Sequence, residues 1–337
     1  GLDDAGQAIW NLELVASLPR PPGFFDPQNP GELPGILMKE DDESEGAEEE
    51  TEKEDDEEIP DKDKRYPLLS FSNTDIAFSG DVMVAGSYHG FNVYRLQEDG
   101  VPQHLSSVVC PGGQGDVSIV GDLLIMSVEQ TRGRLDCGLE GISEDVSAER
   151  FRGLRIFDIS DLTRPVQVGA VQTCRGSHTH SVVSGPGDDG KIIVYNSGTS
   201  SVRDEEEMPG CIDESPGDSR TALFRIDVIE IPLDEPAKAR IVHSPAVFAD
   251  PETGALAGLW RGGDHGDETQ DTDRTDQCHD ITVFPEERIA AGACSGNGIL
   301  FDISDPLDPQ RIDEVVDPGF AYWHSATFNN DGTKVIY

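Results

Sequence analysis

Short runs of apolar residues recur along most of the chain and are separated by glycine, proline, asparagine and aspartate. Residues 75–85 (DIAFSGDVMVA) hold two such runs around a Ser-Gly-Asp turn, and residues 116–126 (DVSIVGDLLIM) repeat the pattern. Runs this short, bounded by turn residues, are typical of β-strands rather than helices. The pattern therefore predicts a series of antiparallel hairpins.

A second pattern follows these hairpins and repeats more closely. Residues 153–165 (GLRIFDISDLTRP) return as residues 298–309 (GILFDISDPLDP), and residues 90–96 (GFNVYRL) form a looser copy. The aspartate and serine side chains can bond nearby backbone groups and close a turn, while the proline restricts how the chain enters the next strand. Each copy therefore predicts a strand, a turn and a further strand.

The hairpins and the copies together make one repeating unit. Two of the four spacings between equivalent strand starts are 41 residues (75 to 116) and 44 residues (280 to 324), the length of a four-stranded propeller blade. The two longer spacings, 64 and 100 residues, contain inserted loops at about 130–152, 198–220 and 250–277. The first strands of the units begin at Asp75, Asp116, His180, Asp280 and His324.

We therefore predict an all-β fold, a β-propeller of four-stranded blades. Residues 73–337 make four full blades and part of a fifth, so we expect C-terminal blades beyond them and a ring of six or seven. Residues 1–22 contain a run (NLELVASLP) that matches the fourth strand of a blade, and residues 10–20 are expected to close the ring by pairing with its last blade. Residues 23–72 form an acidic, low-complexity insertion between these parts.

The repeat resembles that of the LVIVD-repeat family of bacterial exported and cell-surface β-propellers. The resemblance is carried by the Asp-Ile-Ser-Asp copies that begin at Gly153 and Gly298, and by the inner-strand starts at Asp116 and Asp280. It covers about four fifths of the chain and implies a propeller fold, without implying an activity. One unit departs from the pattern, because residues 221–231 (TALFRIDVIEI) keep the strand but lack the Asp-Ile-Ser-Asp turn.

The charge of the chain narrows the classes of partner. There are 66 acidic and 25 basic residues, for a net charge of -41. Such a surface repels phosphate, so we exclude nucleic acid as a partner, and it attracts cations, basic proteins and positively charged substrates. Fourteen acids and one lysine fall between Glu40 and Glu58, and so dense a block of like charge predicts a mobile loop.

The six cysteines point to an exported protein. Their number is even and no Cys-x-x-Cys metal motif is present, which favours disulfides and an extracellular, cell-surface or periplasmic location. No apolar run approaches the roughly eighteen residues that span a bilayer, so the chain is not expected to be membrane-spanning. Cys278 and Cys294 flank one predicted hairpin and are expected to pair. The other expected pairs, one choice among several connectivities, are Cys137 with Cys211 and Cys110 with Cys174.

Histidines and aspartates gather at the predicted inner-strand starts, which converge on the mouth of a propeller's central channel. Neutral imidazoles and carboxylates are ligands of zinc, copper, iron and manganese, so we predict a divalent transition-metal site at this mouth. Strand alternation would turn His279 away from the others, because it precedes Asp280 by one residue. The competing interpretation is a hydrogen-bonded polar plug that ties the inner strands together. The candidate ligands are His178, His180, His279, His324, Asp116 and Asp280.

A second candidate metal site lies in the third insertion. Residues 264–276 (DHGDETQDTDRTD) are rich in the oxygen ligands that calcium prefers. The competing interpretation is a solvated acidic loop without bound metal. The predicted calcium ligands are Asp264, Asp267, Asp271 and Asp273.

No strong catalytic motif accompanies these features, since the chain has neither a Gly-x-Ser-x-Gly elbow nor a glycine-rich phosphate loop that follows a strand. The predicted function is therefore an exported binding or assembly scaffold whose long loops contact a protein, glycan or cell-surface partner. Self-assembly through an unclosed sheet edge is a further possibility. The alternative is a metal-dependent oxidoreductase or hydrolase that uses the histidine-rich mouth.

Overall fold

A computed structural model describes residues 6–21, 24, 73–213, 218–250, 252–256 and 258–337. The described residues are almost entirely strand, turn and loop, with one short 3-10 helix at η3(Pro236–Lys238). Within them, no helix has the length and hydrophobicity required to traverse a bilayer. The acidic block predicted to form a mobile loop lies outside the described residues.

Four antiparallel sheets of four strands each follow one another along the chain. The first contains β1(Asn73–Ser79), β2(Val82–Ser87), β3(Gly90–Leu96) and β4(Pro102–Val109). The second contains β5(Val117–Val120), β6(Leu123–Val128), β7(Gly153–Asp158) and β8(Val166–Gln172). The third contains β9(Thr179–Ser184), β10(Lys191–Ser197), β11(Asp227–Pro232) and β12(Arg240–His243). The fourth contains β15(Asp280–Phe284), β16(Ile289–Cys294), β17(Asn297–Asp302) and β18(Gln310–Val315).

Two short hairpins complete the described strands. β13(Gly263–Asp264) pairs with β14(Asp271–Thr272) inside the third insertion. β19(Thr327–Phe328) pairs with β20(Val335–Ile336) at the position where a fifth unit was predicted to begin. The strand boundaries therefore agree with the repeat seen in the sequence.

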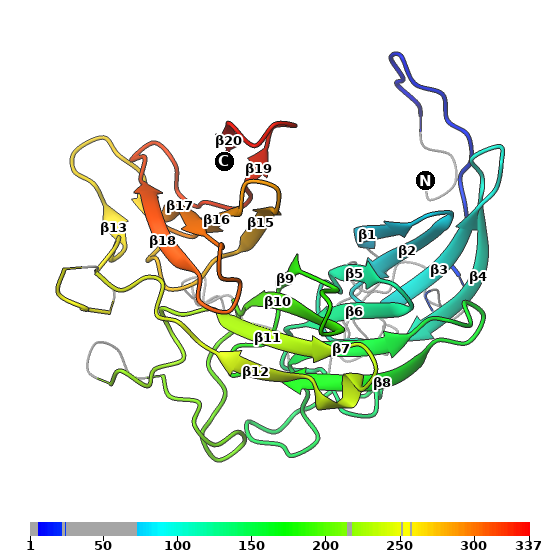
Figure 1. Ribbon diagram of the computed structural model, residues 1–337, viewed down its shortest axis with the longest axis horizontal. Helices are drawn as coiled ribbons and strands as arrows, with labels where there is room; N and C mark the ends of the chain where they lie inside the picture. Colours follow the sequence, from blue (N-terminus) through cyan, green and yellow to red (C-terminus); the bar gives the residue numbers. More distant parts are fainter. Residues whose placement is uncertain (1–5, 22–23, 25–72, 214–217, 251, 257) are drawn as a thin grey trace, which may run out of the picture.

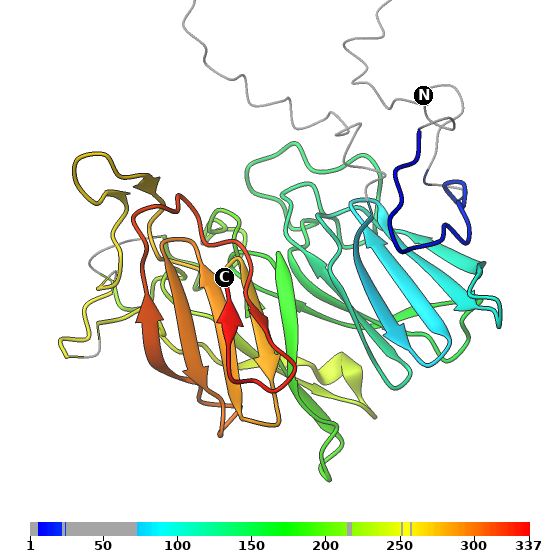
Figure 2. The same ribbon diagram turned by 90° about the horizontal axis from the view of Figure 1, so that it is seen from above.

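The sheets are arranged around an arc, as the blades of a propeller are. Figure 1 shows the first strand of each unit (β1, β5, β9, β15 and β19) on the inner side of this arc, with the later strands of each full sheet outside it. Neighbouring inner strands contact one another, and Figure 2 shows the same arrangement from above. The all-β, propeller-like fold is confirmed, whereas the number of blades and the closure of a ring stay predictions.

The glycines that open two copies of the repeat have a steric explanation. Gly90 and Gly153 begin the third strands of their sheets with φ near +132° and +141°. A Cβ at either position would lie 2.0 Å from a carbonyl oxygen of the adjacent strand, that of Val108 or Val171. A side chain cannot be accommodated there, and glycine alone readily adopts this backbone conformation.

The Asp-Ile-Ser turn also forms as predicted. The backbone N–H of Ser160 donates to Asp158 Oδ1 at 2.8 Å, and the N–H of Ser304 donates to Asp302 Oδ1 at the same distance. These local bonds connect the third and fourth strands of the second and fourth sheets.

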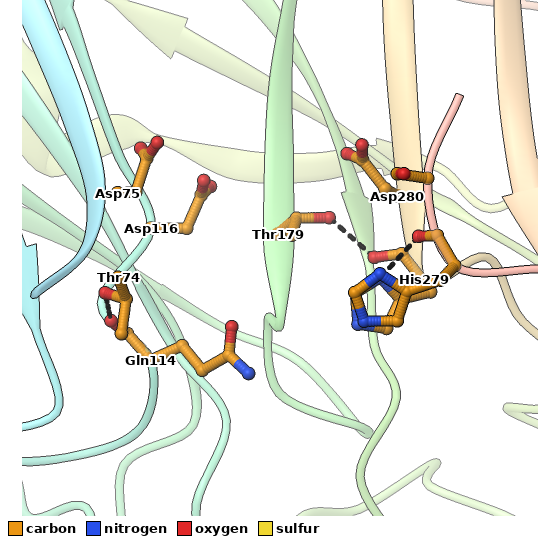
Figure 3. Close-up of a pocket in the computed structure, with 9 residues that line it drawn as sticks. Thr74, Asp75, Gln114, Asp116, Thr179, His279 and Asp280 are labelled. Atoms are coloured by element: carbon orange, nitrogen blue, oxygen red, sulfur yellow. Dashed lines mark hydrogen bonds between the residues drawn. The ribbon is translucent and has the colours of Figure 1, made fainter. Parts of the chain in front are cut away.

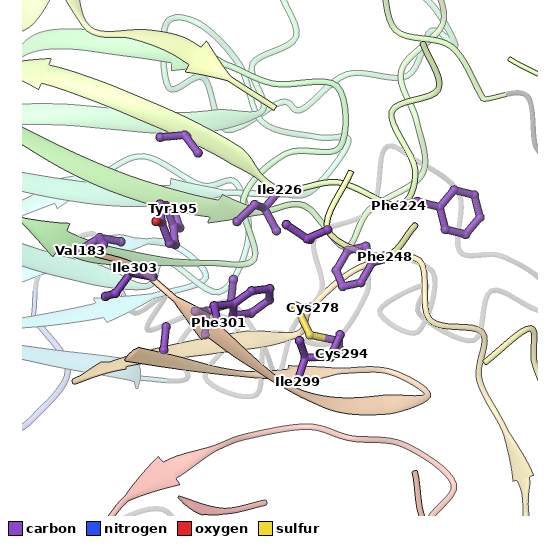
Figure 4. Packing of buried hydrophobic residues seen from close by; sticks show 14 of the residues in the cluster. Val183, Tyr195, Phe224, Ile226, Phe248, Cys278, Cys294, Ile299, Phe301 and Ile303 are labelled. Carbon is purple, nitrogen blue, oxygen red and sulfur yellow. A yellow bond between two sulfur atoms is a disulfide. The ribbon is translucent and has the colours of Figure 1, made fainter. Parts of the chain in front are cut away.

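The core lies between consecutive sheets and explains why the strands are apolar on both faces. One cluster joins the third and fourth sheets, with Tyr195 of β10 and Ile299 and Phe301 of β17 each no more than 1% exposed (Figure 4). Equivalent clusters join the first sheet to the second and the second to the third. Burial of this apolar area holds the sheets side by side.

The N-terminal segment is not paired with any of the described sheets. Residues 6–21 form no strand in the structure, and Trp10 and Leu12 are 84% and 81% exposed. The last described sheet contains only β19 and β20, so it has no third strand against which residues 10–20 could pair. The predicted partner, the last blade of a complete ring, is not among the described strands, so closure of the ring by residues 10–20 stays a prediction.

Three disulfides are present, and only one of the predicted pairs is among them. Cys278 bonds Cys294 across the β15–β16 hairpin, as predicted. The predicted Cys137–Cys211 and Cys110–Cys174 pairs are wrong, because the structure joins Cys110 to Cys137 and Cys174 to Cys211. Each of these two bridges joins an insertion to the segment that precedes the inner strand of the same sheet. Neither bridge connects two insertions.

We expect the Cys110–Cys137 bridge to protect its insertion from proteolysis. In the double variant Cys110→Ser/Cys137→Ser, trypsin should cut within residues 130–152 about tenfold faster, since local opening no longer has to act against a cross-link. The matched control is Cys278→Ser/Cys294→Ser, whose bridge spans only 16 residues of one hairpin. Equal cleavage of this insertion in both variants, measured by mass spectrometry of the fragments, would contradict the expectation.

Candidate functional site

The inner strands converge on a cavity of about 270 Å³. Its walls come from the starts of five units, and Figure 3 shows Asp75 and Asp116 on one side of Thr179 with His279 and Asp280 on the other. The lining is predominantly polar in residue type. It consists of Thr74, Asp75, Gln114, Asp116, Thr179, His279, Asp280, His324 and Ser325.

Three aspartates from three sheets line this cavity, and their pKa values are shifted in different directions. Burial, followed by the charge of Asp116, raises the pKa of Asp75 although its Oδ2 accepts a 3.0 Å bond from the N–H of Val117. Burial and Asp116 likewise raise the pKa of Asp280. None of the ion pairs between described residues joins Asp75, Asp116 or Asp280 to a lysine or an arginine. Among the described residues, the cavity is therefore a negative site without a lysine or arginine counter-charge.

Asp116 differs from the other two because His180 holds it. Its Oδ2 lies 2.8 Å from Nδ1 of His180 and accepts the backbone N–H of the same residue at 2.9 Å. Burial alone would raise the pKa of Asp116, but its interactions with His180 lower it overall. Ser127 Oγ also lies 2.8 Å from His180 Nδ1, whereas Nε2 of His180 is buried without a hydrogen-bond partner.

Three other histidines are in contact at the same mouth, His178 edge-on to His279 and His279 stacked on His324. The ring centroids of His178 and His279 are 4.2 Å apart, and those of His279 and His324 are 3.8 Å apart. Nε2 of His178 lies 2.7 Å from Nε2 of His279. Burial, and then the neighbouring His178 and His324, lower the pKa of His279 to about 4. His279 is therefore neutral at physiological pH.

The opposite nitrogens of two of these rings are already occupied. Nδ1 of His178 lies 2.6 Å from Glu129 Oε2, and Thr199 Oγ1 donates to the same carboxylate oxygen at 3.0 Å. Nδ1 of His279 lies 2.7 Å from the backbone carbonyl oxygen of His324. Both rings are thus fixed in orientation by acceptors behind them.

The prediction that His279 faces away from the other histidines is wrong. Thr179 Oγ1 donates to the carbonyl oxygen of His279 at 2.9 Å, which places β9 and β15 side by side in the expected register. His279 precedes the first residue of β15, Asp280, so strand alternation does not yet govern its side chain.

The six predicted transition-metal ligands do not form one cluster. The rings of His178, His279 and His324 contact one another, while His180 and Asp116 form a separate pair and Asp280 lines the cavity. Among the described residues, no three histidine, cysteine, aspartate or glutamate side chains are placed to hold a metal ion. Metal binding at the mouth stays a prediction.

The predicted calcium loop is described and its four aspartates are all exposed. Asp264 and Asp271 face each other across the β13–β14 pair, Asp267 lies in the turn between these strands, and Asp273 follows β14. The described part of this loop contains no metal-binding group of three such side chains either. Calcium binding here also stays a prediction.

Sequence reasoning missed several polar residues of the site. Glu129 follows the end of β6 and meets His178 from 49 residues away, which no local pattern signals. Gln114, Thr179 and Ser325 are easier to explain afterwards, because each lies within two residues of a predicted inner-strand start. The positions of these three residues next to predicted inner-strand starts are therefore the signal that could have identified them.

Comparison with known proteins adds only a distant likeness of fold. A functionally unknown protein from Desulfotomaculum acetoxidans DSM 771 has a TM-score of 0.44 and 11% identity, over 78% of this chain and 61% of that one. The periplasmic gluconolactonase PpgL of Pseudomonas aeruginosa has a TM-score of 0.47 and 12% identity, over 78% and 64%. The chain thus spans less than two thirds of each structure. No family model and no curated protein matches it, so membership of the LVIVD-repeat family stays a prediction.

Proposed function

We propose that the protein is an exported binding module that holds a small, positively charged organic ligand at the mouth of its inner strands. The observation that carries this proposal is the convergence of Asp75, Asp116 and Asp280 from three sheets on one cavity without a lysine or arginine partner among the described residues. A carboxylate cluster that the fold itself does not neutralise favours a ligand that brings the positive charge.

The size and lining of the cavity support a small organic cation. At about 270 Å³ the cavity is just below the usual range for small-molecule sites, and it is much larger than one bare ion needs. Hydroxyl and amide groups of Thr74, Gln114 and Ser325 line it beside the aspartates. Such groups can accept or donate further hydrogen bonds to an amine-bearing ligand.

Two properties of the whole chain are consistent with this role. Its net charge of -41 would draw cations toward the surface and raise their local concentration near the mouth. Its three disulfides support residence in an oxidising compartment, outside the cytoplasm. A binding module of this kind agrees with the scaffold predicted from the sequence, but it assigns binding to the mouth rather than to the long loops.

Calorimetric titration with putrescine, at near-physiological salt, tests this proposal. We expect saturable binding at one site, and the neutral analogue 1,4-butanediol should not bind, because its hydroxyls cannot neutralise the aspartates. The double variant Asp75→Asn/Asp280→Asn should bind putrescine at least about tenfold more weakly.

The matched control is Asp267→Asn/Asp271→Asn, which removes two exposed carboxylates from the third insertion and leaves the mouth unchanged. This control also accounts for putrescine that adheres to the acidic surface in general. Equal affinity of the wild type and the mouth variant, or equal binding of 1,4-butanediol, would rule out the proposed site.

The alternative function, a metal-dependent oxidoreductase or hydrolase, requires a bound metal with an open coordination position. The pairing of His178 with His279 bears directly on that requirement.

A further inference from the structure

The contact between His178 and His279 does not follow the usual pairing of one hydrogen-bond donor with one acceptor. Each Nδ1 faces an atom that can only accept, namely the carboxylate of Glu129 and the backbone carbonyl of His324. Each Nδ1 must therefore carry the proton. In a neutral imidazole the other nitrogen, Nε2, then has a lone pair and no hydrogen.

Nε2 of His178 lies only 2.7 Å from Nε2 of His279, and the two ring planes are inclined to each other by 61°. Two acceptors cannot remain so close unless a cation lies between them. A shared proton and a metal ion are the two species that can fill this role.

We propose that Nε2 of His178 and Nε2 of His279 are ligands of one divalent transition-metal ion of the cobalt, nickel, copper and zinc class. Two nitrogens bound tetrahedrally to one zinc ion at roughly 2.0–2.1 Å lie roughly 3.3 Å apart, so the rings need to separate by only about half an ångström. This ligand pair is a subset of the six residues considered from the sequence, and it excludes His180 and the aspartates.

The surroundings of the pair match those of metal-bound histidines. Such rings almost always donate their second N–H to a carboxylate or a backbone carbonyl, which sets the tautomer and the ring orientation. His178 has the first arrangement and His279 has the second. Glu129 is thus a positioning residue, itself held by the hydroxyl of Thr199.

Two protein ligands leave other coordination positions for water or a ligand in the cavity that His279 lines. This inference is independent of the proposed capture of an organic cation, because it needs neither Asp75 nor Asp280. Loss of metal binding and loss of putrescine binding can therefore be distinguished by which variants cause them.

The test uses the full chain without a histidine tag, treated with EDTA and then dialysed into excess Mg²⁺, which occupies the acidic surface. Titration with Cu²⁺ should give one tight site per chain, with nitrogen hyperfine splitting from two imidazoles in the electron paramagnetic resonance spectrum. His178→Gln and His279→Gln should each weaken Cu²⁺ binding more than tenfold and reduce the splitting to one nitrogen.

His243→Gln provides the matched control, because His243 is an exposed histidine at the end of β12. It should leave both affinity and splitting unchanged. Glu129→Gln should weaken Cu²⁺ binding about tenfold while the two-nitrogen spectrum is retained, which a purely structural role would not produce.

Several outcomes would overturn the proposal. Cu²⁺ affinity that is the same in His178→Gln as in the wild type would do so, as would a spectrum without nitrogen splitting. Nitrogen-15 spectra of the histidine rings provide the decisive comparison with a shared proton. If His178 is protonated on both nitrogens near neutral pH and its signals do not change when Zn²⁺ is added, the proton rather than a metal bridges the pair.

Discussion

Asp75→Asn and Asp280→Asn should each raise the melting temperature by on the order of 2 °C at pH 7, although each weakens putrescine binding. The pKa of both carboxyls is raised, mainly by burial and also by Asp116, so their ionised forms are less favourable in the folded protein than in the unfolded chain. Asparagine removes the charge and keeps an oxygen that can accept the N–H of Val117 at the Asp75 site. Gains in stability that accompany losses in binding are typical of functional sites.

The pH dependence follows from the direction of these pKa shifts. The penalty is absent below the ordinary aspartate pKa of about 3.9, grows as the pH rises through the raised pKa, and is complete at neutral pH. The advantage of either variant over the wild type should therefore be present at pH 7 and disappear near pH 3.5. Thermal unfolding followed by circular dichroism at several pH values measures this.

Asp116→Asn provides the contrasting variant. Interactions with His180 hold the pKa of Asp116 below its ordinary value, so its charge stabilises the fold and asparagine should lower the melting temperature. If the mouth were only a hydrogen-bonded plug, all three substitutions would lower it. That result would refute the assignment of Asp75 and Asp280 to ligand binding.

Glu207→Gln should lower the free energy of unfolding by about 3–5 kcal/mol, because it leaves two buried guanidinium groups without their counter-charge. The Glu207 carboxylate pairs with Arg150 and Arg203, and all three side chains are at most 5% exposed. The N–H of Ser147 also donates to it at 2.9 Å. This group connects the insertion at 130–152 to the insertion at 198–220.

Urea unfolding of Glu207→Gln beside Glu206→Gln measures this effect. Glu206 is exposed, so its substitution should change stability by no more than about 0.5 kcal/mol. Burial acts to raise the pKa of Glu207, but the N–H of Ser147 and the arginines lower it overall. Its contribution is therefore complete above the ordinary glutamate pKa and is lost as the pH falls through the lower folded-state pKa. A loss below about 1 kcal/mol at pH 7 would contradict the prediction.

Much of the fold could be predicted because its determinants are local and repeated. The Asp158 and Asp302 turns close through bonds to residues two positions away, and the steric need for Gly153 is set by the strand beside it. Once the repeat was aligned, topology alone brought Asp75, Asp116 and Asp280 to one mouth. This convergence follows from the alignment of the repeats and does not require the number of blades to be known.

The remaining features depend on contacts between insertions, which a repeat does not encode. The partners of Cys110 and Cys174 are chosen by how each long loop folds back on the sheet that carries it. Glu129 is recognisable only once His178 has been placed beside it. The orientation of His279 depended on whether the strand begins at residue 279 or at residue 280. Sequence patterns do not locate a strand boundary to within one residue.

The three disulfides occupy corresponding places in their units. Each begins just before an inner strand, at Cys110, Cys174 or Cys278, and ends at or beyond the second strand. The cross-links thus begin next to the inner-strand starts, the same end of the sheets where His279 and the cavity aspartates lie. In a reducing environment this end should loosen before the sheets separate, so that capture of a ligand would depend on the oxidation state of its surroundings.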